Sequence, residues 1–292
     1  MKKEIFKGVG TAIATPFTED DVNYEEFGRL FEDQIKAGVD AIIVRGTTGE
    51  SSTMTDSEKK KLIKYAIDKN AGRIKVIIGT GGNNTFKAIE VSQYAEEAGA
   101  DGLLLVTPYY NKTTQEGLVA HYKKIADSVS LPIILYNVPS RTGVNILPET
   151  CLELSKIENI VGIKEASGDI SQVAKIAHLC GENLDIYSGN DDQVIPILSL
   201  GGKGVISVLS NVMPEYTVEM VNSYFNGDMA QASKMQVEAI DMIDALFCEV
   251  NPIPVKYALN KKGYNFGTPR LPLIELSDKG KEKVDKVLKK YM

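Results

Sequence analysis

Eight short apolar runs recur along the first 208 residues, and helical patterns separate each run from the next. Runs of this length, bounded by turn-forming residues, are typical of strands that are buried on both faces. Strands that alternate with helices are joined by right-handed crossovers and form a parallel sheet. The runs fall at residues 8–17, 40–44, 76–79, 103–106, 132–136, 161–164, 184–187 and 204–208.

Eight is the number of strands that closes a (β/α)8 barrel, and α/β barrels of this size commonly form one domain. We therefore predict the α/β class, with a (β/α)8 TIM barrel at residues 1–226. No strand pattern follows Pro214, and helical patterns at 229–247, 254–261 and 278–291 predict a C-terminal helical appendage at residues 227–292. Because no low-complexity linker intervenes, we expect the appendage to pack on the barrel.

The composition argues against several classes of function. Lysine and arginine number 33 against 39 acidic residues, a net charge of −6, so nucleic acid and anionic membranes are not expected partners. The N-terminus lacks the apolar core of a signal peptide, and no stretch approaches the ~18 apolar residues of a membrane span, so we expect a cytoplasmic protein. Three separated cysteines and two histidines predict no disulfide framework and no metal site, and we expect no cofactor.

Active sites of (β/α)8 barrels lie at the carboxyl ends of the strands, so the residues that follow each run are the most informative. No cluster with metal-ligand spacing occurs there. The rim instead gathers one lysine, several phenols and hydroxyls, and one arginine: Lys164, Tyr136, Tyr109, Tyr110, Thr47, Thr48, Ser207 and Arg141. This set is suited to imine chemistry on a keto acid, in which an amine condenses with the ketone and a phenol moves protons.

Lys164 ends the sixth run, and its chemistry depends on its burial. Desolvation disfavours the ammonium, so burial would lower its pKa from ~10.4 toward ~7–8 and supply a neutral nucleophilic amine. Alternatively, the side chain extends from the barrel mouth to solvent. The presence of Tyr136 at the end of the adjacent fifth run favours the nucleophile.

The other candidates also have purely structural interpretations when each is taken alone. Tyr136 could be a core aromatic residue, residues 47–48 a plain turn, and Arg141 a solvated loop charge. Residues 109–110 could form an interface patch. Their joint placement on one rim is what favours a catalytic site.

Six motifs on or near this rim fit one known family. They are GTTGE at 46–50, PYYN at 108–111, YNVPSRTG at 136–143, GIKEASGD at 162–169, GND at 189–191 and NPIPVK at 251–256. In order and spacing they closely resemble dihydrodipicolinate synthase (4-hydroxy-tetrahydrodipicolinate synthase), of the N-acetylneuraminate lyase-like class I aldolases, over essentially the whole chain. The resemblance implies a lyase that condenses pyruvate with L-aspartate 4-semialdehyde, the first committed step toward diaminopimelate and lysine.

That resemblance implies roles for individual residues. Lys164 would form the Schiff base with pyruvate, and Tyr136 would be the central acid and base. Thr48 and Tyr110 would complete a proton relay with it, and Tyr110 would reach into the site of a neighbouring subunit. The family is usually a homotetramer, a dimer of tight dimers, so self-association is implied.

The resemblance also implies how the substrates are held. Thr47 and Thr48 would bind the pyruvate carboxylate, and Arg141 would bind the carboxylate of aspartate semialdehyde. Gly189 and Ile206 would line the site through their backbones.

Alternatives stay open at this level. N-acetylneuraminate lyase and 2-keto-3-deoxy sugar-acid aldolases resemble this family in their lysine and tyrosine, although the Thr47-Thr48 pair and Arg141 favour the synthase. A non-catalytic barrel that serves as a binding protein would have little reason to retain Lys164 and Tyr136 on adjacent strands. A phosphate-handling barrel would need a glycine-rich anion site after the seventh or eighth strand, and residues 207–211 supply none clearly.

Two departures from the family pattern stand out. Arg45 occupies a place where the family usually has a small or apolar residue, and a charge there is costly unless it is paired, for which Glu50 is the expected partner.

The second departure concerns regulation. The family's lysine-binding regulatory pocket would match Ser51, Asn83 and Tyr109. Two lysines replace residues that bind the effector there. Lys87 stands where lysine-sensitive members carry a glutamate, and Lys59 replaces another ligand. Because like charges repel, we expect the protein to be insensitive to lysine.

Overall fold

The computed structural model describes residues 4–291. Its strands hydrogen-bond in chain order from β1 to β8 and close into a barrel, so the predicted (β/α)8 TIM barrel is confirmed. The residues divide into two compact units, 4–8 with 75–206, and 9–74 with 207–291. The strands are β1 (Gly8–Ala12), β2 (Ala41–Val44), β3 (Lys75–Gly79), β4 (Gly102–Val106), β5 (Ile133–Asn137), β6 (Ile160–Glu165), β7 (Asp185–Ser188) and β8 (Gly204–Ser207).

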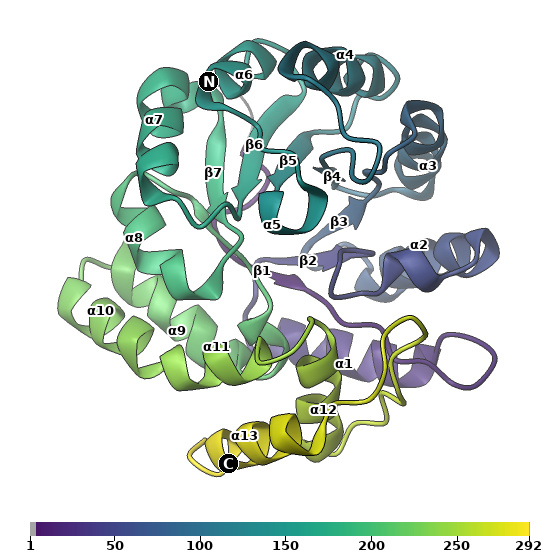
Figure 1. The fold of residues 1–292 in the computed structure, drawn as a ribbon, viewed down its shortest axis with the longest axis vertical. Coiled ribbons are helices and arrows are strands. Elements are labelled where there is room, and N and C mark those ends of the chain that lie inside the picture. The colour runs from purple at the N-terminus through teal and green to yellow at the C-terminus, as the bar shows by residue number, and fades with distance from the viewer. Residues whose placement is uncertain (1–3, 292) are drawn as a thin grey trace. The chain divides into compact units, whose positions relative to one another are not determined.

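In the unit of residues 75–206, strands β4, β5 and β6 are successive neighbours in the sheet (Figure 1). Leucine, isoleucine and valine dominate them, and nearly every residue is buried, as expected for parallel strands that are covered on both faces. The register sets Tyr136 on β5 opposite Lys164 on β6. The two residues therefore stand at the same level, close to the carboxyl ends of their strands.

Short polar side chains begin the longer helices of this unit, because they accept hydrogen bonds from the free N–H groups of the first turn. Thr114 does so with the N–H of Gly117 at 3.2 Å. The helical segments are α3 (Thr85–Ala98), α4 (Gln115–Ala126), α5 (Pro139–Thr142), α6 (Pro148–Leu154), α7 (Ile170–Cys180), η2 (Gly181–Asn183), η3 (Asp191–Gln193) and α8 (Val194–Ser199).

The second unit holds the first two helices and all those that follow β8. A capping box opens α2, in which Thr55 and Glu58 exchange backbone and side-chain hydrogen bonds of 2.8 and 3.2 Å. The helical segments are α1 (Tyr24–Lys36), η1 (Ser51–Thr53), α2 (Asp56–Asn70), η4 (Leu209–Asn211), α9 (Pro214–Phe225), α10 (Met229–Glu238), α11 (Ile240–Leu246), α12 (Ile253–Lys261) and α13 (Asp278–Leu288).

One predicted helix is two helices in the structure. The pattern over residues 229–247 predicts a single helix, but α10 ends at Glu238 and α11 begins at Ile240. Buried apolar residues continue on both sides of the break, so the pattern carries no sign of it. The domain boundary at 226/227 stays a prediction.

The last two helices lie side by side (Figure 1). The hydroxyl of Tyr257 on α12 donates to Asp285 on α13 at 3.0 Å, and Val284 and Leu288 of α13 are buried. No helix within residues 4–291 is both long and apolar enough to cross a membrane.

Candidate active site

Lys164 lies at the carboxyl end of β6, with 5% of its surface exposed. Because burial penalises the ammonium form, desolvation lowers the pKa of Lys164 to about 8. The negative charge of Asp191 opposes this shift, and the positive charge of Arg141 adds to it. The structure thus does not support a lysine that extends to solvent, and it makes a neutral amine available near neutral pH.

Tyr136 is the aromatic neighbour of this lysine. The Nζ atom of Lys164 lies 4.4 Å from the centroid of the Tyr136 ring, and the tyrosine is itself buried. The face of an aromatic ring attracts a cation, so this contact holds the lysine side chain over the ring. The structure thus brings together the amine and the phenol that the sequence places on adjacent strands.

Gly189, just after β7, lies against the same lysine. A Cβ atom at this position would stand 3.1 Å from Cε of Lys164 and 2.7 Å from Cβ of Ala166. Any larger residue would therefore clash with Ala166 and crowd the Lys164 side chain. Glycine is needed here for space, and the expectation that Gly189 lines the site through its backbone stays a prediction.

Arg141 and Ile206 differ in their exposure. Arg141 belongs to the short helix α5 and is exposed, so by exposure it is a solvated charge. Its charge nevertheless lowers the pKa of Lys164, which places the guanidinium within electrostatic reach of the amine. Ile206 on β8 is fully buried.

The loop after β4 exposes two phenols. Tyr110 is 91% exposed with a left-handed backbone at φ 70°, and Tyr109 is 40% exposed. The Asn83 side chain donates to the carbonyl oxygen of Tyr109 at 3.2 Å, so two residues of the predicted regulatory pocket lie together. Lys87 is exposed and pairs with Glu90 on its own helix at 2.8 Å.

A buried polar network behind Lys164 was not anticipated. The Glu165 carboxylate accepts hydrogen bonds from the side chains of Asn137 and Gln172 and from the N–H of Ser167, at 2.7–3.3 Å. Burial raises the pKa of Glu165, and these hydrogen bonds oppose the shift. Asn137 and Glu165 directly follow Tyr136 and Lys164 in sequence, so their shared register was the available signal.

In the second unit, Thr47 and Thr48 lie in a tight turn after β2, where the N–H of Gly49 donates to the carbonyl oxygen of Gly46 at 3.1 Å. Thr48 is 2% exposed, and its Oγ1 accepts a hydrogen bond of 3.0 Å from Nδ2 of Asn251. The sequence had singled out the motif that begins at Asn251 without giving it a role.

The expected pairing of Arg45 with Glu50 is wrong. Glu50 forms a fully buried ion pair with Lys256 at 2.8 Å and accepts the N–H of Arg270 at 2.9 Å. Arg45 is 8% exposed, and its Nε and Nη1 atoms have no hydrogen-bond partner among the described residues. Desolvation lowers the pKa of Arg45 to about 10, and Asp56 opposes the shift. The carboxylate of Glu50 is bound instead by Lys256, which lies 206 positions further along the chain.

The two remaining residues of the predicted regulatory pocket lie on successive elements of this unit. Ser51 opens η1, and Lys59 pairs with Asp56 across the first turn of α2 at 3.3 Å.

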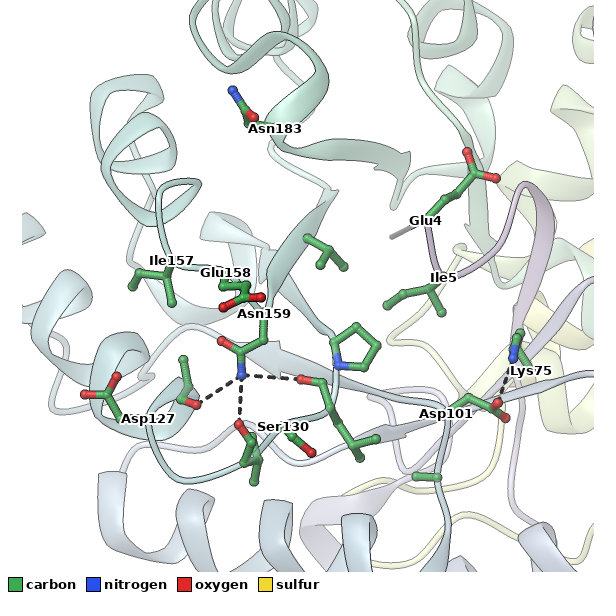
Figure 2. Close-up of a pocket in the computed structure, with 16 residues that line it drawn as sticks. Glu4, Ile5, Lys75, Asp101, Asp127, Ser130, Ile157, Glu158, Asn159 and Asn183 are labelled. Atoms are coloured by element: carbon green, nitrogen blue, oxygen red, sulfur yellow. Dashed lines mark hydrogen bonds and ion pairs between the residues drawn. The ribbon is translucent and has the colours of Figure 1, made fainter. Parts of the chain in front are cut away.

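A large cavity lies at the opposite ends of the strands from Lys164. The hollow has a volume of about 1000 Å³ and is lined mainly by residues that precede or begin β3 to β7, such as Lys75, Asp101 and Asn159. Figure 2 shows how these three residues lie. The Asn159 side chain donates to the carbonyl oxygens of Ala126 and Val129, both at 3.0 Å (Figure 2). The amino ends of barrel strands serve stability, so we assign no chemistry to this cavity.

Metal-ligating side chains do not gather anywhere in the described part of the chain. Within residues 4–291, no group of three or more histidine, cysteine, aspartate or glutamate residues is placed to hold a metal ion.

A buried amine of lowered pKa beside a phenol, on adjacent strands of a (β/α)8 barrel, defines the class of Schiff-base-forming lyases. Comparison with known proteins gives the family. The model of the dihydrodipicolinate synthetase family matches residues 5–291, and the chain belongs to this family. The resemblance noted from the motifs is confirmed.

Individual relatives match over nearly their whole length. The 4-hydroxy-tetrahydrodipicolinate synthase of Thermoanaerobacter sp. (strain X514) is 60% identical over 98% of this chain and 97% of its own. The crystal structure of dihydrodipicolinate synthase from Thermotoga maritima has a TM-score of 0.96 at 45% identity, covering 98% and 99% of the two chains. The enzyme from Cyanidioschyzon merolae, solved with lysine bound, has a TM-score of 0.95 at 39% identity and covers 98% of each chain.

Proposed function

We propose that this protein is a 4-hydroxy-tetrahydrodipicolinate synthase, which condenses pyruvate with L-aspartate 4-semialdehyde on the route to diaminopimelate and lysine. The observation that carries the proposal is the environment of Lys164, a buried lysine with a pKa of about 8 held over the ring of Tyr136. Membership of the family supports the choice of substrates.

The chemistry begins with the neutral amine of Lys164. Its Nζ attacks C2 of pyruvate, and the ketone oxygen leaves as water to give an iminium. The iminium withdraws electrons, so C3 loses a proton and becomes an enamine carbon. That carbon forms the new bond to the aldehyde carbon of the second substrate, whose oxygen takes up a proton. The substrate's amino group then displaces Lys164 from the iminium carbon as the ring closes.

Proton movement falls to Tyr136, whose ring centroid lies 4.4 Å from the amine nitrogen. Thr48 and Tyr110 continue the relay, and Thr48 has a hydroxyl that is already engaged on one side by Asn251. Relay by positioned side chains contributes about 10²- to 10⁴-fold to such a step.

The carboxylates of the two substrates need separate partners. Thr47 and Thr48 bind the pyruvate carboxylate, and Arg141 binds that of aspartate semialdehyde. The exposure of Arg141, together with its electrostatic reach to Lys164, suits a residue that receives an incoming anion. Gly189 and Ile206 line the site through their backbones.

The assembly proposed is a homotetramer built as a dimer of dimers, in the cytoplasm. The 91% exposure of Tyr110 supports this proposal, because a large aromatic side chain left in solvent is typical of an interface.

A competition among second substrates tests the proposed reaction. With pyruvate fixed, the enzyme is given aspartate semialdehyde, N-acetylmannosamine or glyceraldehyde, and product formation is followed by mass spectrometry. We expect turnover with aspartate semialdehyde and little with the sugars. Faster turnover of either sugar would instead establish a related pyruvate-dependent aldolase.

A further inference from the structure

The NPIPVK segment at 251–256 joins the C-terminal part of the chain to the Thr47–Glu50 loop by two buried hydrogen bonds. Nδ2 of Asn251 donates to Oγ1 of Thr48 at 3.0 Å, and Nζ of Lys256 donates to Oε1 of Glu50 at 2.8 Å. All four residues are 5% exposed or less. The loop is thus held at two points by residues more than 200 positions further along the chain.

The two bonds differ in what they can do. Lys256 and Glu50 neutralise each other, and Lys256 also stands 4.5 Å from the ring centroid of Phe17. This pair fixes the backbone of the loop, where Glu50 adopts a left-handed conformation at φ 51°. The bond from Asn251 instead reaches the side-chain hydroxyl of a proposed relay residue.

The direction of the Asn251 bond determines the direction of the Thr48 hydroxyl. An amide nitrogen has hydrogens to give and accepts none, whereas a hydroxyl has one hydrogen and two lone pairs. Because Oγ1 of Thr48 uses a lone pair to accept from Nδ2, its single hydrogen has to be donated elsewhere.

The Asn251 amide points its nitrogen at Thr48 although its oxygen then has no hydrogen-bond partner in the described part of the chain. Oδ1 of Asn251 is buried and has no hydrogen-bond partner among residues 4–291. An unsatisfied buried carbonyl is costly, so a residue chosen for stability alone would not leave it so. Such local exceptions are expected at functional sites.

We propose that Asn251 is a positioning residue that fixes the Thr48 hydroxyl as a proton donor for the condensation. The inference rests on the proposed function, specifically on the role of Thr48 in the relay. It assigns the same motif a second task, in which Lys256 holds the loop and Asn251 orients its hydroxyl.

The variant Asn251→Asp tests this directly, because a carboxylate of nearly the same shape can only accept. It would draw the Thr48 hydrogen toward itself and away from the relay. We expect kcat to fall by about 10- to 100-fold, within the range of acid–base contributions, with a smaller change in the KM for pyruvate. As pH falls and the new carboxyl is protonated, it regains a hydrogen to donate, so the ratio of variant to wild-type kcat rises.

A purely structural role would not give that pH dependence. The matched control is Asn260→Asp, since the Asn260 side chain makes two hydrogen bonds, to the backbone of Gly267 and Phe266, and neither involves a proposed catalytic group. We expect its kcat ratio to be independent of pH. Full activity in Asn251→Asp, or a flat ratio, would overturn the inference.

A double-mutant cycle keeps the test decisive even if Asn251→Asp does not fold. If Asn251 acts through Thr48, the double variant Thr48→Val with Asn251→Ala should be no slower than Thr48→Val alone. Additive losses would contradict the proposal. If the wild type condenses pyruvate and the Asn251 variants are equally active, only this inference fails. If the wild type is inactive, the proposed function fails.

Discussion

Burial makes Lys164 a weaker base than an ordinary lysine, although the negative charge of Asp191 favours its protonated form. Desolvation lowers its pKa to about 8, Asp191 opposes the shift, and Arg141 reinforces it. The unperturbed value is ~10.4, so at neutral pH the buried lysine supplies far more neutral amine than a surface lysine would. The position of the residue could be predicted from the sequence, but its burial required the fold.

The pH dependence of imine formation follows from this environment. With pyruvate alone, the rate should rise with pH through a midpoint near 8, because only the neutral amine attacks the ketone. In Arg141→Leu the cationic neighbour is lost, the ammonium is less disfavoured, and the midpoint should move to higher pH. Stopped-flow measurement of the half-reaction keeps the second substrate out of the assay. A midpoint that stays fixed or falls would contradict this assignment.

Sensitivity to lysine is also a residue-scale property. Lys87 and Lys59 place two positive charges among the residues that match the family's regulatory pocket, where a lysine effector would bring a third. We expect millimolar lysine to leave most of the activity, and Lys87→Glu to increase inhibition, because a carboxylate can pair with the effector's ammonium.

The control for this prediction is Lys123→Glu, which makes the same charge change at an exposed helical lysine that pairs with Asp127. Initial rates are measured against lysine concentration for all three proteins. Half-inhibition of the wild type in the millimolar range would show that the pocket accepts lysine despite its charges.

Among the secondary-structure elements, the hydrophobic periodicity of the sequence predicted the strands correctly. Contacts between residues far apart in the sequence could not be predicted in this way. The eight apolar runs each predicted one of the eight strands. Nothing in the sequence marked the break between α10 and α11, since apolar residues continue through it. The predicted pairing of Arg45 with Glu50 was wrong because it assumed a partner nearby in the sequence. Glu50 instead pairs with the distant Lys256.

The Glu50–Lys256 pair predicts a large stability effect. Both side chains are 1% exposed, so Lys256→Met leaves a buried carboxylate without its cation. Breaking such a pair costs about 3–5 kcal/mol, which urea or thermal unfolding would detect.

An exposed pair in the same unit provides the comparison. Lys64 and Asp68 are 68% and 62% exposed and 2.9 Å apart, so Lys64→Met should cost less than about 1 kcal/mol. Equal losses in the two variants would mean that the buried pair contributes no more than a surface one.

For the molecule as a whole, the barrel was predicted from strand counting, whereas the assembly was implied by the resemblance alone and stays a prediction. Family membership covers residues 5–291, whereas the exposure of Tyr110 became visible only in the folded chain. Tyr110 is 91% exposed in one chain, and we propose that a second copy of the chain covers it in the assembly.

Complementation between two inactive variants tests that shared site. Lys164→Ala lacks the nucleophile and Tyr110→Phe lacks the relay phenol, so each homo-oligomer should be slow. If Tyr110 serves the neighbouring subunit, mixed oligomers contain sites with an intact lysine from one chain and an intact tyrosine from the other. Activity should therefore appear on mixing after dissociation and reassembly. Failure to recover activity, with mixed oligomers present by native mass spectrometry, would place Tyr110 outside its neighbour's site.

The imine between Lys164 and pyruvate is the step on which the other proposed roles depend. Incubation with pyruvate and borohydride, followed by intact-mass measurement and peptide mapping, reports the adduct directly. We expect one reduced pyruvate adduct per chain, located on Lys164, and none in Lys164→Ala. Absence of an adduct in the wild type, or an adduct on a different lysine, would rule out Lys164 as the imine-forming residue.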